Sequence, residues 1–339
     1  MKTLVTGAAG RIGANLVRAL LEKGYEVRTF VLPDDPKESK LAGMDMEIVH
    51  GDLRDARAVE KAMDGVDSVA HLGYIMGRPS GMTQATEFEI NINGTFNMLE
   101  AASARGDRIE RFLFASTNAT YDVFHARYVP VDEEHPQEPN SFYGMEKLLG
   151  ERMIEGYVRQ FGLRGTTVRF GTVPGPDEVL NYLSATYVMG ILRSRGTDPT
   201  STVYAPGVEA PWKPVEEAIQ SGYRLVVPRN LHGKSWMQDL VDVRDTVHGV
   251  LCALEHENAV GEIFNTTGFG VTWEEAIPYL AEKTGQSYLD IKMPNLWHWR
   301  CDNTKAKDLL DYMPQYPIPR MIDDALAFQA GEDISVFPA

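Results

Sequence analysis

The chain has 339 residues, of which 43% are hydrophobic and 24% charged, a composition typical of ordinary globular proteins rather than disordered or fibrous ones. Its 33 basic and 48 acidic side chains give a net charge of −15, which disfavours nucleic acid as a partner. Without a signal peptide, a membrane-length apolar stretch or more cysteines than Cys252 and Cys301, we expect a cytoplasmic protein with no metal site and no membrane contact.

The first ~170 residues alternate short apolar runs with amphipathic stretches, which predicts a parallel sheet with helices on both faces. Right-handed crossovers then make the expected fold α/β, a Rossmann-type doubly wound sheet with a smaller C-terminal lobe. Strands are expected at 2–6, 26–31, 46–50, 67–71, 110–115 and 165–169, and helices at 11–23, 56–63, 84–105 and 141–161.

Beyond residue 173 frequent prolines break this alternation, which indicates a second lobe that would bind substrate. A strand at 240–243, a helix from Arg244 to about Leu254 and a strand at 263–264 suggest that the chain re-enters the first domain. We therefore expect a dinucleotide-binding domain at 1–173 with about 236–265, and a substrate lobe at about 174–235 with 266–339.

A glycine-rich turn follows the first strand directly and opens the first helix. Gly7 allows the tight turn, Gly10 lets the backbone approach a pyrophosphate, and Gly13 permits close packing of helix on strand. The free N–H groups of the helix N-terminus attract phosphates. The turn therefore predicts dinucleotide binding, with contacts also from Arg11 and Ile12.

Two further strand ends point to the same ligand. Asp52 follows the third strand and is placed to accept the adenine amino group, whereas Asp55 is the better N-cap for the next helix. Gly73, at the end of the fourth strand, leaves room for a ribose, and His71 is read as a core residue without a catalytic role.

Tyr143 and Lys147 stand four residues apart on a predicted helix and so share one face. Lowering a tyrosine pKa by ~3 units takes about 4 kcal/mol, and a unit charge ~4 Å away at an effective dielectric constant of ~20 supplies about that much. Lys147 is suited to this task. The fifth strand delivers the hydroxyls of Ser116 and Thr117 to the carboxyl edge of the sheet, where ligands bind.

In their joint order these features resemble the extended short-chain dehydrogenase/reductase superfamily, specifically its NAD-dependent epimerase/dehydratase branch. The resemblance covers most of the chain. The motifs that carry it are Thr6-Gly7-x-x-Gly10-x-x-Gly13, Gly51-Asp52-Leu53, Asn91-Ile92-Asn93-Gly94-Thr95, Ser116-Thr117, Tyr143-x-x-x-Lys147, Pro174-Gly175-Pro176, Val241-Asp242-Val243-Arg244-Asp245 and Asp302-Asn303-Thr304-Lys305-Ala306.

The resemblance implies three catalytic residues. Thr117 would hold the substrate oxygen, Tyr143 would be the acid–base group, and Lys147 would tune Tyr143 and bond the nicotinamide ribose; Ser116 remains the alternative to Thr117. Further cofactor contacts are implied for Asp52, Leu53, Leu72, Gly73, Asn91, Phe170 and Val173. Substrate contacts are expected from Tyr74, Thr117, Asn118 and Thr172.

Several positions depart from the family pattern and bear on the substrate. Asn118 and Ala119 occupy the places of the acid–base pair of family dehydratases, which disfavours elimination of water. Gln238 and Lys292 stand where sugar-nucleotide enzymes carry diphosphate-binding arginines, which puts a nucleotide-diphosphate site in doubt. The tryptophans of Trp297-His298-Trp299-Arg300 are read as anchors of the small lobe, with stacking on a substrate as the alternative.

The end of the second strand does not decide between NAD and NADP. Its end lacks both an acid for the ribose diol and an arginine for a 2′-phosphate. Asp34 or Asp35 could supply the acid, and Arg11 or Arg28 the base. NAD is favoured because no basic pair stands at the strand's end, and NADP is not excluded.

The sequence thus favours an NAD(P)-dependent oxidoreductase acting at a secondary alcohol or ketone of a sugar-like molecule, as a dehydrogenase or an epimerase. One alternative is an NADPH-dependent reductase for a non-sugar ketone or aldehyde, similar to the dihydroflavonol-reductase branch. Another is a dinucleotide-sensing protein without catalysis. A homodimer is also expected, because helices 84–105 and 141–161 resemble those that pair in this family and carry outward apolar residues.

Overall fold

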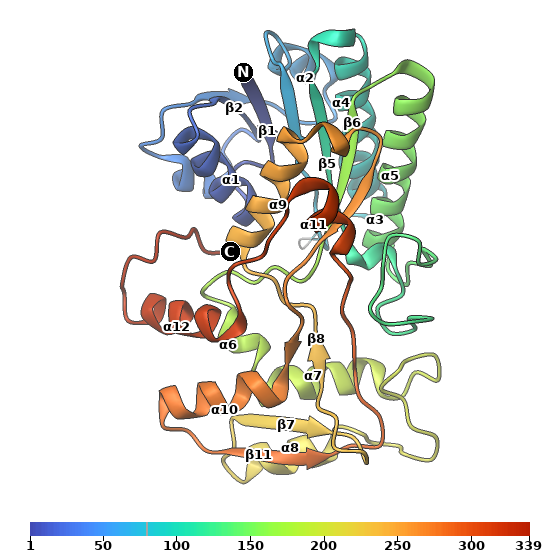
Figure 1. The fold of residues 1–339 in the computed structure, drawn as a ribbon, viewed down its shortest axis with the longest axis vertical. Helices are drawn as coiled ribbons and strands as arrows, with labels where there is room; N and C mark the ends of the chain where they lie inside the picture. Colours follow the sequence, from blue (N-terminus) through green and yellow to red (C-terminus); the bar gives the residue numbers. More distant parts are fainter. Residues whose placement is uncertain (79–80) are drawn as a thin grey trace.

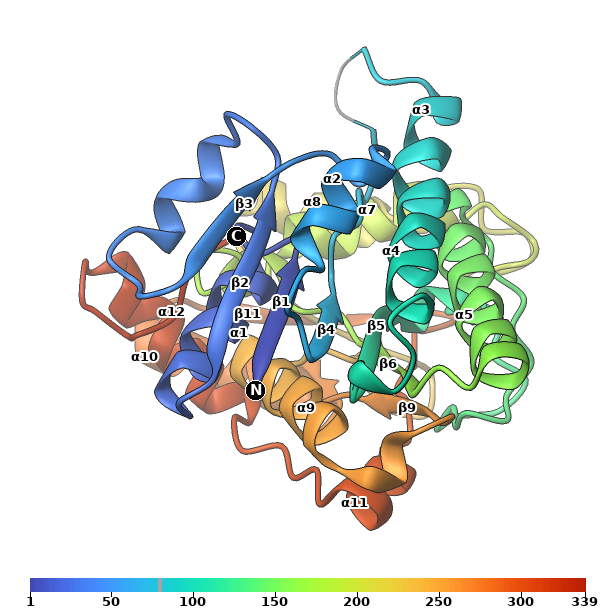
Figure 2. The same ribbon diagram turned by 90° about the horizontal axis from the view of Figure 1, so that it is seen from above.

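A seven-stranded parallel sheet forms the centre of the molecule, with strand order β3-β2-β1-β4-β5-β6-β9 (Figures 1 and 2). The computed structural model describes residues 1–78 and 81–339. The strand order reverses between β1 and β4, and in open parallel sheets ligands bind at the carboxyl ends of the strands beside such a reversal. The strands are β1 (Lys2–Thr6), β2 (Glu26–Val31), β3 (Glu47–His50), β4 (Ser68–His71), β5 (Arg111–Thr117), β6 (Gly165–Phe170) and β9 (Ile263–Thr266).

Helices cover both faces of this sheet, as the near-continuous apolar strands require (Figure 2). Adjacent residues of β1 show the two-sided burial: Val5 belongs to the apolar core under one set of helices, and Leu4 to the core under the other. The first set is α1 (Arg11–Glu22), α9 (Val243–Glu255) and α11 (Thr304–Leu310); the second is α2 (Ala56–Ala62), α4 (Gly94–Ser103) and α5 (Phe142–Phe161). The doubly wound α/β fold is thereby confirmed.

The predicted helix at 84–105 consists of three consecutive pieces. They are α3 (Gln84–Phe88), a π-helical turn η2 (Glu89–Asn93) and α4. Single π turns inside helices often occur at functional sites. Short 3₁₀ helices lie at η1 (Pro36–Leu41), η3 (Gly106–Arg108), η4 (Asn118–Thr120) and η5 (Glu257–Ala259).

A smaller lobe lies beyond the carboxyl edge of the sheet (Figure 1). It holds two small sheets, β7 (Leu225–Arg229) with β11 (Tyr288–Lys292), and β8 (Met237–Gln238) with β10 (Val271–Thr272). Its core contains Trp297 and Trp299, 6% and 1% exposed, which supports the reading of these tryptophans as anchors. Its helices are α6 (Val179–Tyr182), α7 (Ala185–Arg195), α8 (Lys213–Gln220), α10 (Trp273–Thr284) and α12 (Ile318–Gln329).

The strand predicted at 240–243 is wrong. Leu240 forms only an isolated bridge with Thr172, and Asp242 is the N-cap of α9, where its side chain accepts from Arg244 N. The run of apolar residues imitates a strand, but the capping aspartate begins a helix instead. The other predicted strands and helices are present, with ends that differ by a few residues.

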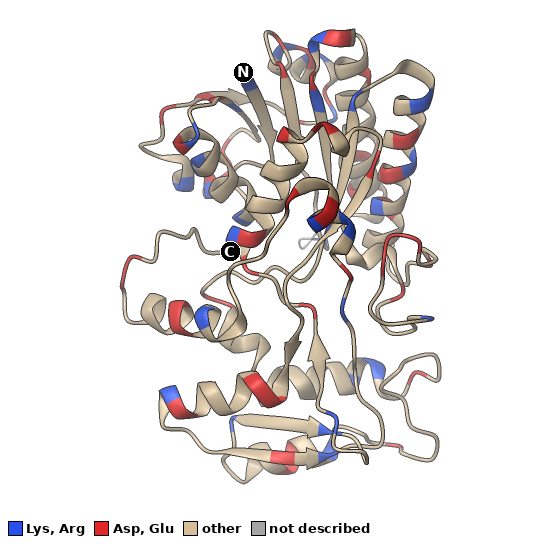
Figure 3. Cartoon of the chain, viewed as in Figure 1, with Lys and Arg blue, Asp and Glu red and all other residues tan. Residues whose placement is uncertain are grey.

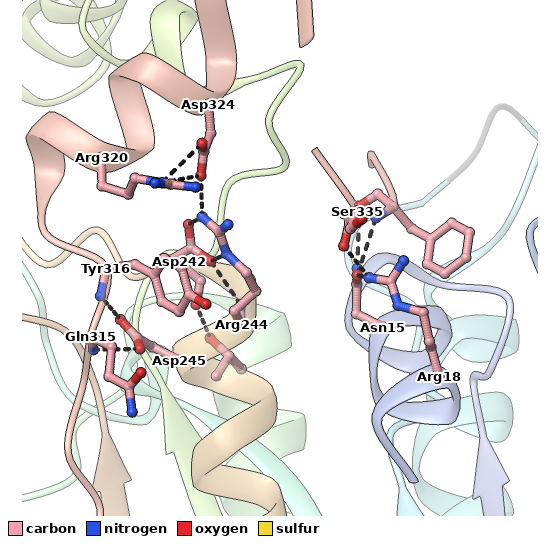
Figure 4. Close-up of polar contacts among 12 residues, drawn as sticks. Asn15, Arg18, Asp242, Arg244, Asp245, Gln315, Tyr316, Arg320, Asp324 and Ser335 are labelled. Carbon is pink, nitrogen blue, oxygen red and sulfur yellow. Dashed lines mark hydrogen bonds and ion pairs between the residues drawn. The ribbon is translucent and has the colours of Figure 1, made fainter. Parts of the chain in front are cut away.

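The last part of the chain returns to the large lobe and contacts α9 and α1, two of the three helices on one sheet face (Figure 4). Arg244 of α9 bonds Asp324 of α12 at 2.6 Å, and Asp245 accepts from Gln315 N and Tyr316 N at 2.7 and 3.0 Å. Asn15 of α1 exchanges two hydrogen bonds with the backbone of Phe337. In the described part of the chain no helix has the length and apolarity to span a membrane.

Candidate active site

The glycine turn forms an open cradle at the N-terminus of α1. Gly7 has a φ of +66°, and a Cβ there would lie 2.8 Å from Gly73 N. A Cβ at Gly13 would lie 2.1 Å from Gly7 O, so neither position tolerates a side chain. Gly10 is the N-cap of α1 and has no side chain to bond the first-turn N–H groups. These features fit the pyrophosphate of a dinucleotide.

Arg11 does not project freely from this turn. Its guanidinium donates to Val173 O in the loop after β6 and pairs with Glu178 at 2.6 Å. Glu178 in turn accepts from Gly175 N at 3.0 Å. Arg11 therefore connects the phosphate cradle to the loop that leads into the small lobe, and Ile12 packs partly buried against the core.

The adenosine is expected at the ends of β3 and β4. The Asp52 carboxylate is paired with Arg54 at 2.6 Å, and that guanidinium holds the pKa of Asp52 below its usual range. Leu53 lies under Gly73 and Gly94, where a Cβ would meet it at 3.1 and 2.8 Å. Leu72 is partly buried against the core on the other face of the sheet, the one that contains Val5, and Asp55 caps α2 as predicted.

The residues on and after β2 that could select between NAD and NADP have different surroundings. Arg28 is buried and bonds Glu47 and Ala62 O, both at 2.8 Å, so its guanidinium is committed elsewhere. Asp35 caps η1 by accepting from Lys37 N. Asp34, with a φ of +59°, has no such capping role in the described contacts.

Tyr143, Lys147 and Thr117 meet at the carboxyl edge between β5 and α5. α5 begins after Ser141, which accepts from Gly144 N, so the helix places Tyr143 in its first turn. Lys147 Nζ donates to Ala115 O at 2.6 Å and lies 5.9 Å from the centroid of the Tyr143 ring. Thr117, the last residue of β5, lies close enough to Tyr143 for its side chain to affect the pKa of the phenol, and its Oγ1 accepts from Ala119 N at 3.2 Å.

Burial dominates the ionisation of this pair. It raises the pKa of Tyr143 well above 10, while the nearby Thr117 side chain lowers that pKa in part. It also lowers the pKa of Lys147 to about 7, against the opposing charges of Glu151 and Glu146. The sequence predicts that Lys147 lowers the pKa of Tyr143, but in this geometry Lys147 Nζ is turned to Ala115 O and burial prevails.

Ser116 faces the opposite side of β5 from Thr117, as alternation along a strand requires. Its hydroxyl donates to Glu151 Oε1 at 2.5 Å, and Glu151 also accepts two bonds from Arg169, at 2.9 and 2.7 Å. Glu151 and Arg169 are 0% and 2% exposed at their side chains. Ser116 is thus tied into a buried ion pair, which leaves Thr117 as the hydroxyl beside Tyr143.

Asn91 and Tyr74 join the loop after β4 to α5. Asn91, in the π turn, exchanges two hydrogen bonds with the backbone of Ile75 and donates to Glu146 Oε2 at 2.8 Å. The Tyr74 ring lies 3.5 Å from Lys147 Nζ, and its hydroxyl donates to Glu146 O. Tyr74 therefore packs against the catalytic candidates instead of standing free for substrate.

The loop after β6 supplies the remaining predicted positions. Phe170 and Val173 are almost fully buried beside the cradle. Thr172 lies near Gln238, whose buried amide also bonds the Tyr187 hydroxyl at 3.0 Å. Asn118 begins η4 and is 8% exposed. Lys292 lies exposed at the end of β11, an edge strand at the far end of the small lobe.

Sequence reasoning missed Glu146, Glu151 and Arg169. Glu151 could have been found, because it follows Lys147 by one helical turn on the same face of α5. In the described part of the chain, no three His, Cys, Asp or Glu side chains gather as metal ligands would.

Comparison with known proteins agrees with this geometry. The model of the NAD dependent epimerase/dehydratase family matches residues 3–266. A uronate dehydrogenase of Pseudomonas putida is 33% identical over 183 residues, which cover 52% of this chain and 63% of that protein. A putative UDP-glucose 4-epimerase of Methanocaldococcus jannaschii is 28% identical over 309 residues, covering 88% and 92% of the two chains.

Among solved structures, a short-chain dehydrogenase/reductase superfamily protein of Agrobacterium tumefaciens with bound NAD superimposes with a TM-score of 0.79 and 27% identity. The match covers 98% of this chain and 100% of that one. With the glycine cradle, the strand order and a family match over well more than half of the chain, this protein belongs to the NAD-dependent epimerase/dehydratase family.

Proposed function

We propose that this protein is an oxidoreductase that uses NAD to transfer hydride at a secondary alcohol or ketone of a sugar-like substrate, as a dehydrogenase or an epimerase. The observation that carries the proposal is the convergence of Thr117, Tyr143 and Lys147 at the sheet edge next to the glycine cradle. The backbone N–H groups at the start of α1 would hold the cofactor phosphates.

Tyr143 is the proposed acid–base group. When bound, NAD supplies the hydride acceptor. Tyr143 takes the hydroxyl proton of an alcohol during oxidation and returns a proton to a carbonyl oxygen during reduction. Its raised pKa keeps it protonated in the free protein, which suits the acid role, and a charged Lys147 favours the phenolate needed for the base role.

Thr117 is proposed to fix the substrate oxygen within hydrogen-bonding reach of Tyr143. Its place at the end of β5 makes it rigid, since the strand is buried along its whole length. Phe170 and Val173 would form the apolar wall for the nicotinamide, and Asn118 and Thr172 would contact the substrate. Rigid positioning of both partners lowers the entropic part of the barrier.

The substrate is proposed to lack a nucleotide diphosphate. Gln238 stands where a diphosphate-binding cation would be needed, and its uncharged amide is engaged by Tyr187 and Thr172. Lys292 is remote on β11. The P. putida relative, a uronate dehydrogenase by name, supports a free sugar acid as a candidate. A net charge of −15 also disfavours the binding of a second diphosphate.

NAD is favoured over NADP at the ribose. Arg28, one of the two candidate bases, is buried in bonds with Glu47 and the backbone, and Arg11 is paired with Glu178. The NADPH-dependent reductase therefore remains the less supported alternative.

We also propose that the molecule works as a cytoplasmic homodimer. Its proposed cofactor lobe is 1–173 with about 236–265, and α11 (Thr304–Leu310) adds to it because it packs on the same sheet. The cytoplasm suits Cys252 and Cys301, which are buried and unbridged. Exposed apolar residues on α4 and α5 support the dimer; they are Phe96, Met145, Leu149 and Phe161.

The test is a substrate panel with purified protein and NAD⁺, containing free sugars, sugar acids and UDP-sugars. We expect NADH formation or a new epimer with a free sugar or sugar acid, and no turnover of UDP-sugars. Turnover of UDP-sugars alone would overturn the substrate class. Activity only with NADPH and non-sugar ketones would favour the reductase, and no reaction across the panel would favour the dinucleotide sensor.

A further inference from the structure

Residues 333–339, which we call the strap, connect the small lobe to the cofactor lobe. The strap follows α12, whose buried residues belong to the core of the small lobe, and it runs from there back to the cofactor lobe (Figure 1). Val336 and Phe337 of the strap pack partly buried against the apolar core that contains residues of α1 and α9. The strap is therefore seated on the cofactor lobe and does not project into solvent.

Polar contacts fix the strap on α1 (Figure 4). Asn15 exchanges two hydrogen bonds with the backbone of Phe337, at 3.2 and 3.1 Å, and also donates to Arg11 O at 2.9 Å. Arg18 donates to Ser335 O, and its guanidinium lies 4.7 Å from the centroid of the Phe337 ring. Ser335 has a φ of +54°, which is strained for a residue with a side chain. These contacts therefore hold the strap in a conformation that it would not adopt by itself.

The last two residues of the strap contact two loops at the carboxyl edge of the sheet. Lys40 Nζ, in η1 after β2, donates to Pro338 O at 2.8 Å. Asp177, in the loop after β6, accepts from Ala339 N at 3.1 Å. β2 and β6 stand on opposite sides of the reversal of strand order between β1 and β4. The strap thus links loops from the two sides of the reversal.

The three contacted pieces of chain border the proposed cofactor site. The start of α1 would hold the phosphates, the segment after β2 follows the strand whose end binds the ribose of a dinucleotide, and the loop after β6 carries Val173, part of the proposed nicotinamide wall. Release of a bound molecule requires its surroundings to open locally, and contacts that join those surroundings make opening less frequent. The strap is therefore placed to affect how fast a cofactor leaves.

We propose that the strap is a positioning segment of the cofactor site, which ties the start of α1, η1 and the loop after β6 together and thereby slows the release of NAD. This role rests on the proposed binding of the cofactor at the glycine cradle. The alternative is a purely structural role, in which the strap stabilises the packing of α1 and leaves the release rate unchanged.

Three changes separate these roles. Removal of residues 333–339 takes away all contacts of the strap, and Lys40→Met removes only the bond to Pro338 O. Lys37→Met is the matched control, because it removes the same charge from an exposed side chain of the same 3₁₀ helix. A direct attraction of Lys40 for the cofactor phosphates is tested by combining Lys40→Met with removal of the strap. If Lys40 acts through Pro338, the combination releases the cofactor no faster than removal of the strap alone.

The readout is the rate constant for NADH dissociation, measured by stopped flow. The preformed complex is mixed with excess NAD⁺, and the loss of energy transfer from tryptophan to NADH is followed. Only folded, loaded protein contributes, so partial unfolding lowers the amplitude and leaves the rate unchanged. We expect dissociation to be about tenfold faster without the strap and about threefold faster in Lys40→Met, with Lys37→Met within twofold of the parent.

A parent-like rate without the strap would overturn the proposal, and so would a Lys40→Met effect that persists in full after the strap is removed. If the shortened protein does not fold, Lys40→Met decides alone, because equal rates in Lys40→Met and Lys37→Met would overturn the proposal as well. The measurement needs no turnover. A protein that retains NADH through the strap but converts no substrate would refute the proposed function and not the role of the strap.

Discussion

The two adjacent hydroxyls at the end of β5 have different surroundings. Ser116 donates to the buried Glu151 carboxylate, whereas Thr117 lies beside Tyr143 and accepts from Ala119 N. The sequence could not choose between them, because an alignment error of one residue exchanges them. The alternation of side chains along a strand assigns them to opposite faces once the register is known.

This difference gives a paired prediction. Thr117→Ala should lower kcat about 10- to 100-fold, because the substrate oxygen loses its holder, and should lower the free energy of unfolding by about 1 kcal/mol, because Thr117 Oγ1 caps η4. Ser116→Ala should leave kcat nearly unchanged and lower the free energy of unfolding by about 1–3 kcal/mol, because a buried carboxylate loses a donor. Steady-state kinetics and urea unfolding measure both, and the reverse pattern would contradict the assignment.

The residues that sequence reasoning missed are those whose partners come from other elements. Arg169 lies on β6 and reaches Glu151 on α5 only because β5 and β6 are neighbours. The hydrogen bond from Asn91 to Glu146 likewise depends on how α5 packs against the π turn. A single sequence carries no local signal for such contacts.

At the scale of elements, locally encoded features were predictable. The strand, glycine turn and helix at the N-terminus follow from periodicity and from three glycines, of which Gly7 and Gly13 tolerate no Cβ. The segment at 240–243 was not predictable from its apolar residues, since the deciding feature is the cap that Asp242 provides for α9. The π turn that directs Asn91 towards Ile75 and Glu146 was not predictable either, because the spacing of the apolar residues does not reveal it.

The apolar faces of α4 and α5 lead to an element-scale prediction. The protein should have the mass of a dimer by light scattering at micromolar concentration. Leu149→Glu, a change at a 39% exposed position on α5, should yield monomers because a charge would be buried in the helix–helix interface. Leu309→Glu, at a 37% exposed position on α11, is the matched control and should stay dimeric.

A monomeric parent protein would contradict the dimer proposal, and so would a Leu149→Glu variant that behaves like the Leu309→Glu control.

At the scale of the whole molecule, the distribution of charge bears on how the cofactor is held. Charged residues lie mainly on outer helices and loops, while the central strands are largely uncharged (Figure 3). In a chain of net charge −15, the cofactor phosphates must rely on backbone N–H groups and the start of α1. The class of fold and the glycine turn could be predicted from sequence, whereas the contact of Gln238 with Tyr187 in the small lobe could not, because it joins residues far apart in the chain.

The central claim is that Tyr143 exchanges the proton while hydride moves to or from NAD. The most direct test is Tyr143→Phe, compared with the parent protein for turnover of a substrate found in the panel and for NADH binding by tryptophan fluorescence quenching. Our account predicts a loss of turnover of at least about 100-fold, with an NADH affinity within about twofold of the parent. A variant that retains most of its turnover would contradict the account.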